Sequence, residues 1–141
     1  MDAREFVALV KHDAVDGALN GIATSLSAAL VEPTIPPTEE SVVTQAISDF
    51  VYRGKLQEYQ RARWFQALGT DDQNRILALI RDTAELTGFG VLAILDGVGG
   101  DALGVFEIVE VDGRKRRVLN PENSEMLHDL FSEICESERL G

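Results

Sequence analysis

The dipeptide Asp112-Gly113 is the feature that most constrains the fold of this 141-residue chain. It follows VFEIVEV, residues 105 to 111, a run rich in β-branched and aromatic residues. Asp-Gly after such a run is the strongest short signal for a β-hairpin. We expect Asp112 and Gly113 to be the two turn residues, which places Glu110 opposite Lys115. The chain therefore contains at least a pair of antiparallel strands.

Helical periodicity dominates the sequence before this hairpin. Apolar residues at steps of three and four predict one long helix or two short ones before residue 31: Val15, Leu19, Ile22, Leu26 and Leu30. The stretch from Val31 to Ser41 contains three of the four prolines, so we expect an extended connector there. The N-terminal part is thus predicted to be helical with one long interruption.

Three more helical segments are predicted after the connector. The first has a buried stripe formed by Val43, Ile47 and Phe50 and ends near Gly54. The second runs from Leu56 to Gly69, with Trp64, Phe65 and Leu68 in the core. The third begins with the capping box TDDQ, in which Thr70 caps and Gln73 reaches back, and ends at Gly88.

The remaining segments complete an α+β fold. The apolar run Gly90 to Gly97 is bounded by glycines and predicts a buried strand, with a continued helix as the alternative. After the hairpin, an apolar stripe predicts a C-terminal helix: Leu127, Leu130, Phe131 and Ile134. We expect one globular domain, 1–141, with three to four N-terminal helices, a small antiparallel β-meander or hairpin, and a C-terminal helix.

The formal net charge of −11 restricts the classes of partner. An acidic surface repels nucleic acid and anionic membrane and attracts basic proteins, so neither a membrane nor a nucleic acid is expected as the partner. The basic run Arg114 to Arg117 lies in the hairpin beside Glu107 and Glu110, which reduces its positive charge. The opening MDAREF has no basic region before its apolar residues, so we expect a cytoplasmic protein without a secretory signal.

No set of catalytic residues can be assembled from the sequence. The glycine-rich segment from Asp96 to Gly104 is not followed by a predicted helix that could bind a pyrophosphate. Cys135 adjoins an apolar stripe and is expected to be a buried, inert thiol, and His128 is expected to be solvated and paired with carboxylates. We expect no cofactor and no metal, and the pattern favours a protein that is not an enzyme.

These observations favour an interaction protein. A small acidic domain without a catalytic set is typical of bacterial immunity proteins and antitoxins, inhibitors that dock an acidic face on a basic partner protein. The residues expected to contact that partner lie on the C-terminal helix and the hairpin: Glu125, Asp129, Glu133, Glu136, Arg114 and Arg116. A small metal-dependent hydrolase or ligand-binding enzyme, and a structural subunit that self-associates through apolar helix faces, are the alternatives.

Overall fold

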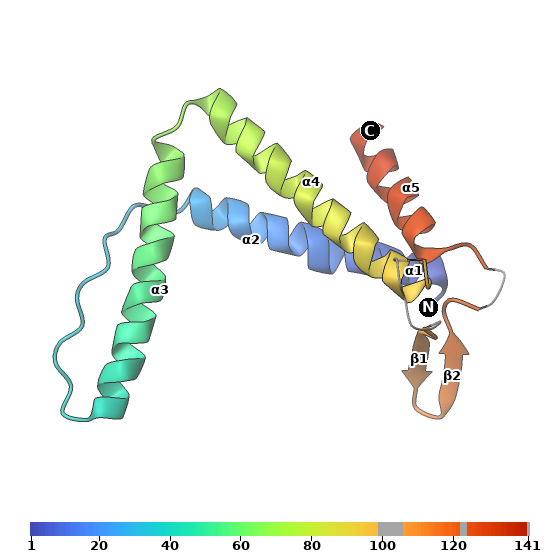
Figure 1. Ribbon diagram of the computed structural model, residues 1–141, viewed down its shortest axis with the longest axis horizontal. Coiled ribbons are helices and arrows are strands. Elements are labelled where there is room, and N and C mark those ends of the chain that lie inside the picture. The colour runs from blue at the N-terminus through green and yellow to red at the C-terminus, as the bar shows by residue number, and fades with distance from the viewer. Residues whose placement is uncertain (99–105, 122–123, 141) are drawn as a thin grey trace. The chain divides into compact units, whose positions relative to one another are not determined.

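The computed structural model describes residues 1–98, 106–121 and 124–140 (Figure 1). It is mainly helical, with a two-stranded antiparallel sheet and a C-terminal helix. The α+β class expected from the sequence is therefore confirmed. None of the helices in these ranges is long and apolar enough to cross a membrane.

The chain divides into two compact units. Unit 1 comprises Met1–Leu19 and Leu79–Gly141, and unit 2 comprises Asn20–Ala78. Unit 1 has 17 acidic and 8 basic residues, which gives a formal charge of −9. Unit 2 has 7 acidic and 5 basic residues, which gives a formal charge of −2. The acidity of the chain thus belongs almost entirely to unit 1. The single domain 1–141 stays a prediction.

The N-terminal helical region contains a π-helix. It consists of α1 (Ala3–Leu9), η1 (Val10–Asp16) and α2 (Gly17–Leu26). The Asp2 side chain accepts a hydrogen bond from the Glu5 amide and the Glu5 side chain accepts one from the Asp2 amide, which completes a capping box. In η1 the turns are wider, as shown by the Gly17 amide donating to the His12 carbonyl, five residues earlier.

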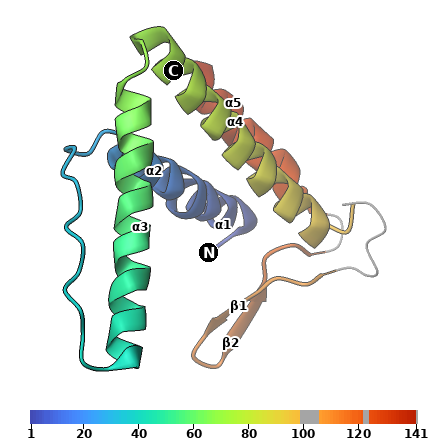
Figure 2. The ribbon, with the colours of Figure 1, turned by 60° about the vertical axis from the view of Figure 1, so that its left-hand side comes forward.

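The helix after the connector is longer than predicted. Helix α3 (Val42–Gln66) passes straight through Gly54, so the predicted end at that glycine is wrong. A glycine inside a helix costs only about 1 kcal/mol relative to alanine, and the flanking residues outweigh this cost. The proline-rich segment is non-helical, as expected, and runs beside α3 in both views (Figures 1 and 2). The Gln66 amide donates to the Leu26 and Ala28 carbonyls and fixes the start of the connector.

Helix α4 (Thr70–Leu95) begins where the sequence predicts, but its predicted capping box is wrong. The Gln73 side-chain amide donates to the carbonyls of Phe65 and Leu68, at 3.2 and 3.1 Å. It therefore satisfies carbonyl groups at the end of α3, which have no partner within that helix.

The strand predicted for Gly90 to Gly97 is also wrong, because α4 continues to Leu95. The helix ends at Gly97, which has a φ of +78°. The Val98 amide bonds to the Ala93 carbonyl and the Gly97 amide to the Ile94 carbonyl, the two bonds of a Schellman motif. Gly97, and not Gly88, is the glycine that terminates this helix. The rest of the glycine-rich segment, residues 99–105, lies outside the described residues.

The hairpin is confirmed, with a register shifted by two residues. Strand β1 (Val109–Asp112) pairs with β2 (Lys115–Val118), and Asp112 lies opposite Lys115. The turn is formed by Gly113 and Arg114, because Gly113 has a φ of +59° and occupies the first turn position, where hairpin turns need a positive φ. The predicted pairing of Glu110 with Lys115 is therefore wrong, and Glu110 lies opposite Arg117.

Helix α5 (Leu127–Leu140) completes the core of unit 1. The buried members of that core come from four helices and include Val7, Val15, Leu92, Leu127, Leu130, Phe131 and Cys135. Gly88 lies in α4 against this core, where a Cβ atom would come within 2.9 Å of the Phe131 ring and 3.2 Å of Val15. The glycine therefore allows α4 to approach the Phe131 side chain closely.

Candidate binding site

A groove lies between α4 and α5 in unit 1. Its volume is about 410 Å³, and nine residues line it: Asp82, Glu85, Leu86, Phe89, Phe131, Ser132, Cys135, Glu136 and Arg139. Leu86 is 71 % exposed, whereas Phe131 is 1 % exposed. The groove thus combines an apolar surface accessible from solvent with a border of charged side chains.

Carboxylates outnumber cations around this groove. Arg139 donates to Asp82 at 3.1 Å and to Glu85 at 2.5 Å, so its charge is neutralised from within the protein. The hydrogen bond and the charge of Glu85 raise the pKa of Arg139 above its usual value. Three lining carboxylates face a single guanidinium, and the net charge of the groove is therefore negative. Such a groove favours a ligand that is both apolar and basic.

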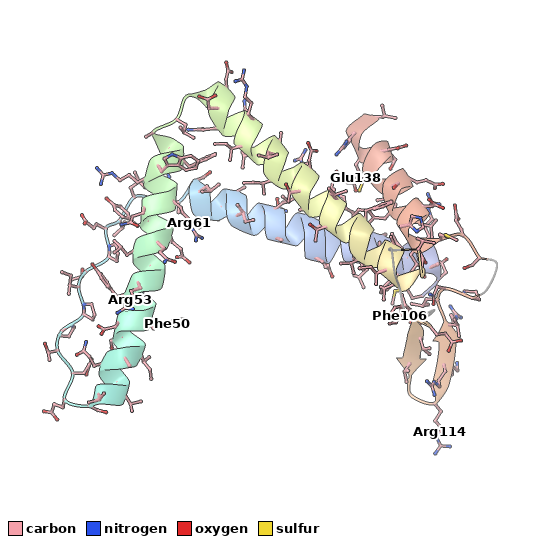
Figure 3. The ribbon with its side chains drawn as sticks, viewed as in Figure 1. Phe50, Arg53, Arg61, Phe106, Arg114 and Glu138 are labelled. Carbon is pink, nitrogen blue, oxygen red and sulfur yellow. The ribbon has the colours of Figure 1, made fainter. Side chains whose placement is uncertain are left out.

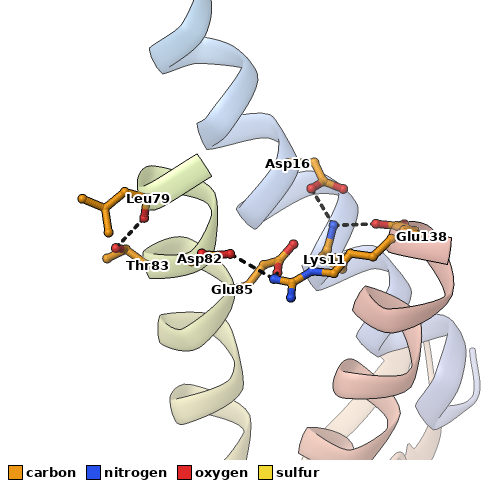
Figure 4. Close-up of polar contacts among 8 residues, drawn as sticks. Lys11, Asp16, Leu79, Asp82, Thr83, Glu85 and Glu138 are labelled. Atoms are coloured by element: carbon orange, nitrogen blue, oxygen red, sulfur yellow. Dashed lines mark hydrogen bonds and ion pairs between the residues drawn. The ribbon is translucent and has the colours of Figure 1, made fainter. Parts of the chain in front are cut away.

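A buried ammonium group lies close to the groove (Figure 4). The Lys11 side chain is 4 % exposed and donates to Asp16 and Glu138, both at 2.7 Å. Burial lowers the pKa of Lys11, but the hydrogen bonds and charges of Asp16 and Glu138 outweigh this effect, so its pKa is raised. Asp16 is five residues after Lys11, and the wider turns of η1 allow this spacing to share a face.

The buried ammonium of Lys11 was not predicted, although the sequence contains a signal for it. Val7, Lys11 and Val15 follow steps of four, so Lys11 occupies the middle of an apolar stripe whose neighbours are both buried. A lysine is almost never fully buried without a partner. The position of Lys11 thus predicts that carboxylates lie beside its ammonium group. It does not predict which carboxylates these are, because Glu138 is distant in sequence.

Cys135 is a free, buried cysteine, as expected from its place beside the apolar stripe. Burial raises the pKa of its thiol, and the charge of Glu85 raises it further. A protonated thiol is a poor nucleophile and a poor metal ligand. Cys135 therefore contributes packing and not reactivity.

His128 is not solvated, which corrects the expectation from the sequence. Its side chain is 14 % exposed, and its Nδ1 atom lies 2.7 Å from Oδ2 of Asp96, a carboxylate that is 5 % exposed. The same Oδ2 accepts a hydrogen bond from the His128 backbone amide at 3.0 Å. Asp96 therefore caps the first turn of α5 from the end of α4.

This cap leads to a prediction for stability. We expect Asp96→Ala to lower the free energy of unfolding by about 1–3 kcal/mol, because it leaves a helix amide and an imidazole nitrogen without their acceptor. Asp96→Asn keeps an acceptor oxygen and is expected to cost less. Urea denaturation followed by circular dichroism measures both. Equal losses for the two variants would contradict the capping role.

The candidate contact residues on α5 lie where the sequence predicts. Asp129, Glu133 and Glu136 are exposed at spacings of four and three residues, and Glu125 is exposed just before the helix. Glu136 also lines the groove. The structure therefore connects the acidic face of α5 to the apolar floor, a connection that the sequence did not reveal.

The candidate residues of the hairpin stand apart from α5. Arg114 is exposed in the turn (Figure 3). Arg116 is exposed on β2. No ion pair within the described residues joins either one to an α5 carboxylate. Arg117 donates to the Met1 carbonyl at 3.2 Å, and Glu110 pairs with the Met1 ammonium at 2.9 Å, so part of the basic run anchors the N-terminus.

Two further expectations for the core of unit 2 are wrong. Trp64 is 56 % exposed, and only Phe65 of the predicted aromatic pair is buried, at 4 % exposed. The stripe of Val43, Ile47 and Phe50 is exposed, because the residues that α3 buries, Ala62 and Phe65, lie in its last two turns. An apolar stripe can predict a helix without showing what covers it.

The comparisons with known proteins leave the class of this protein to its own geometry. No protein-family model, curated protein or solved structure matches the chain. Within the part of the chain that the structure describes, no group of three or more histidine, cysteine, aspartate and glutamate side chains is placed to hold a metal ion.

Proposed function

We propose that this protein is a non-enzymatic, acidic protein-binding module, an inhibitor of the immunity-protein or antitoxin kind, that docks unit 1 on a basic partner protein. The observation that carries the proposal is the groove between α4 and α5, whose apolar floor is continuous with exposed carboxylates. Protein interfaces are typically built this way, with an apolar centre and a polar border.

The floor of the groove supplies the apolar centre. Leu86 is 71 % exposed and lies beside Phe89 and Phe131 in the lining. A partner side chain that covers Leu86 and reaches the aromatic rings removes apolar surface from water, which stabilises a complex by about 25 cal/mol per Å² before the costs of association. The floor therefore supports affinity.

The carboxylates of α5 orient the partner protein and raise the rate of association. No ion pair of the described residues engages Glu136, and Glu133 pairs only with Arg4, in a contact where both side chains are about half exposed. Exposed ion pairs of this kind contribute about 0–1 kcal/mol, so a partner's basic group can replace Arg4 at little cost. Asp129, Glu133 and Glu136 are thus available to a basic surface, and they act mainly through the association rate.

The proposal is tested by capture of a partner from the native host at low salt, followed by measurement of its affinity. We expect a basic protein to be retained, and expect Glu136→Lys to weaken its binding about tenfold at low salt and less at high salt. Glu32→Lys, the same change at an exposed position of unit 2, is the matched control and should leave the affinity unchanged. Equal effects of the two variants, or the absence of any basic partner, would contradict the proposal.

A further inference from the structure

Helix α3 exposes an apolar face in its first three turns. Its members are Val43 at 68 %, Ile47 at 59 %, Phe50 at 79 % and Val51 at 47 % exposed. Single apolar residues are common on protein surfaces, but contiguous groups of this kind mark interaction sites. The residues that α3 buries, Ala62 and Phe65, lie in its last two turns, so the apolar side chains of its first turns stay exposed.

The charges along α3 are arranged in sequence order. Glu39 and Glu40 precede the helix and are exposed, and the Glu39 amide donates to the Gln45 side chain at 2.8 Å, which holds this acidic end on the first turn. All four basic residues of α3 come later, at Arg53, Lys55, Arg61 and Arg63. The acidic residues of α3 itself are Asp49 and Glu58, so an acidic beginning and a mainly apolar first part are followed by a segment, residues 53 to 63, with a net charge of +3.

One basic residue, Arg61, lies on the same side as the apolar part. It follows Phe50 by about three helical turns and projects from the same side of α3 (Figure 3). Gly54 lies on that side between them, and nothing comes within 4 Å of the place where its Cβ would be. Glu58, three residues before Arg61, is exposed and shares this side by helical spacing. The exposed side of α3 thus runs from carboxylates through apolar residues and a glycine to Glu58 and Arg61.

We propose that two copies of this chain associate through antiparallel pairing of their α3 helices. The two-fold axis passes between Phe50 and Val51, so that Ile47 of one copy covers Gly54 of the other. The same register places Glu40 opposite Arg61. A parallel pairing would instead place like charges together, which selects the antiparallel arrangement by charge complementarity.

Each feature of the face has a place in this pairing. The two-fold axis makes the contact self-complementary, so every interaction occurs twice. The absence of a side chain at Gly54 lets the partner helix approach and gives the Ile47 side chain a site. Because the face is a single helix wide, the dimer is weak and dissociates in about the micromolar range.

Cysteine cross-linking in a Cys135→Ala background tests the register. In the antiparallel dimer, Val51→Cys lies beside its own copy near the axis and is expected to form a disulfide-linked dimer under oxidation. Ile47→Cys alone lies about 10 Å from its copy along the axis and is expected not to cross-link. The double variant Ile47→Cys with Gly54→Cys is expected to form a disulfide-linked dimer. Efficient cross-linking of Ile47→Cys alone would show a parallel pair, and no cross-linking of any variant would show that the face has another occupant; either result overturns the proposal.

Sedimentation equilibrium of the 141-residue protein tests which side chains hold the dimer together. We expect Phe50→Asp to be monomeric, with an unchanged circular dichroism spectrum because its side chain is exposed. Glu40→Lys is expected to weaken the dimer about tenfold, since the two-fold axis repeats the change, and Glu40→Lys with Arg61→Glu is expected to restore it. A wild type that stays monomeric at all concentrations, or a double variant no tighter than Glu40→Lys, overturns the proposal. The two surfaces share no residue, so the retention of a basic partner by Phe50→Asp is a result for the proposed function alone.

Discussion

Neutralising the two carboxylates that pair with Lys11 is expected to destabilise the protein more than removing Lys11 itself. Asp16→Asn with Glu138→Gln leaves an ammonium group that is 4 % exposed without a carboxylate, and we expect a loss of about 3 kcal/mol or more. Lys11→Met leaves two carboxylates that are 30 % and 54 % exposed and can be hydrated, so we expect a smaller loss of about 1–2 kcal/mol.

The triple variant, Lys11→Met with Asp16→Asn and Glu138→Gln, is the control for this asymmetry. It has no buried charge at this position and is expected to be more stable than the double variant, with the difference measured by urea denaturation. If the triple variant were the least stable of the set, the loss would come from packing and not from the unpaired charge.

The same cluster gives a pH dependence with a defined sign. The pKa of Lys11 is raised in the folded protein, so the stability that this group contributes is fully present below the pKa of an unfolded lysine, about 10.4. It is lost as the pH rises through the folded value. The free energy of unfolding of the wild type is therefore expected to fall above about pH 10.4 more steeply than that of Lys11→Met.

Gly88→Ala is expected to be the second severe change. An alanine favours a helix by about 1 kcal/mol over glycine, but its Cβ would come within 2.9 Å of the buried Phe131 ring. Overpacking of a dense core costs about 1–3 kcal/mol, and because Phe131 is only 1 % exposed it has no room to move away. We expect a net loss of up to about 2 kcal/mol.

Gly90→Ala provides the matched control in the same helix. Nothing lies within 4 Å of the position of its Cβ, so only the helix propensity changes. We expect this variant to gain about 0.5–1 kcal/mol in thermal or urea denaturation. Similar results for the two glycines would show that the close approach to Phe131 does not limit the packing of α4.

The sequence predicted elements better than it predicted their ends. The hairpin was found because Asp112-Gly113 carries a local backbone requirement, but its register depends on which residue takes the positive φ, and Gly113 takes the first turn position. The sequence predicts helix ends at Gly54 and Gly88, although glycine also occurs inside helices where a neighbour approaches or the flanking turns are strong. Of Gly54, Gly88 and Gly97, only Gly97 has the positive φ that a helix terminator needs.

The sequence predicts only those features of the candidate site that follow from local spacing. The exposed carboxylates of α5 follow from helical spacing alone, and Asp129, Glu133 and Glu136 are exposed as expected. The contacts that shape the site join residues far apart in the chain: Lys11 with Glu138, Glu85 with Arg139, and Asp96 with His128. No local pattern encodes these pairs, because each depends on how the helices of unit 1 pack together.

The π-helix gives the N-terminal region an asymmetric tolerance to changes of length. Each hydrogen-bonded turn of η1 holds one residue more than a turn of an α-helix. Deletion of one residue there is expected to return η1 to α-helical geometry, which keeps nearly the same rotation between the residues on either side, so Val7 and Val15 would both still face the core of unit 1. Insertion of one residue would instead rotate the two sides by about 100° relative to each other. The region is thus expected to accept the loss of one residue far better than the gain of one.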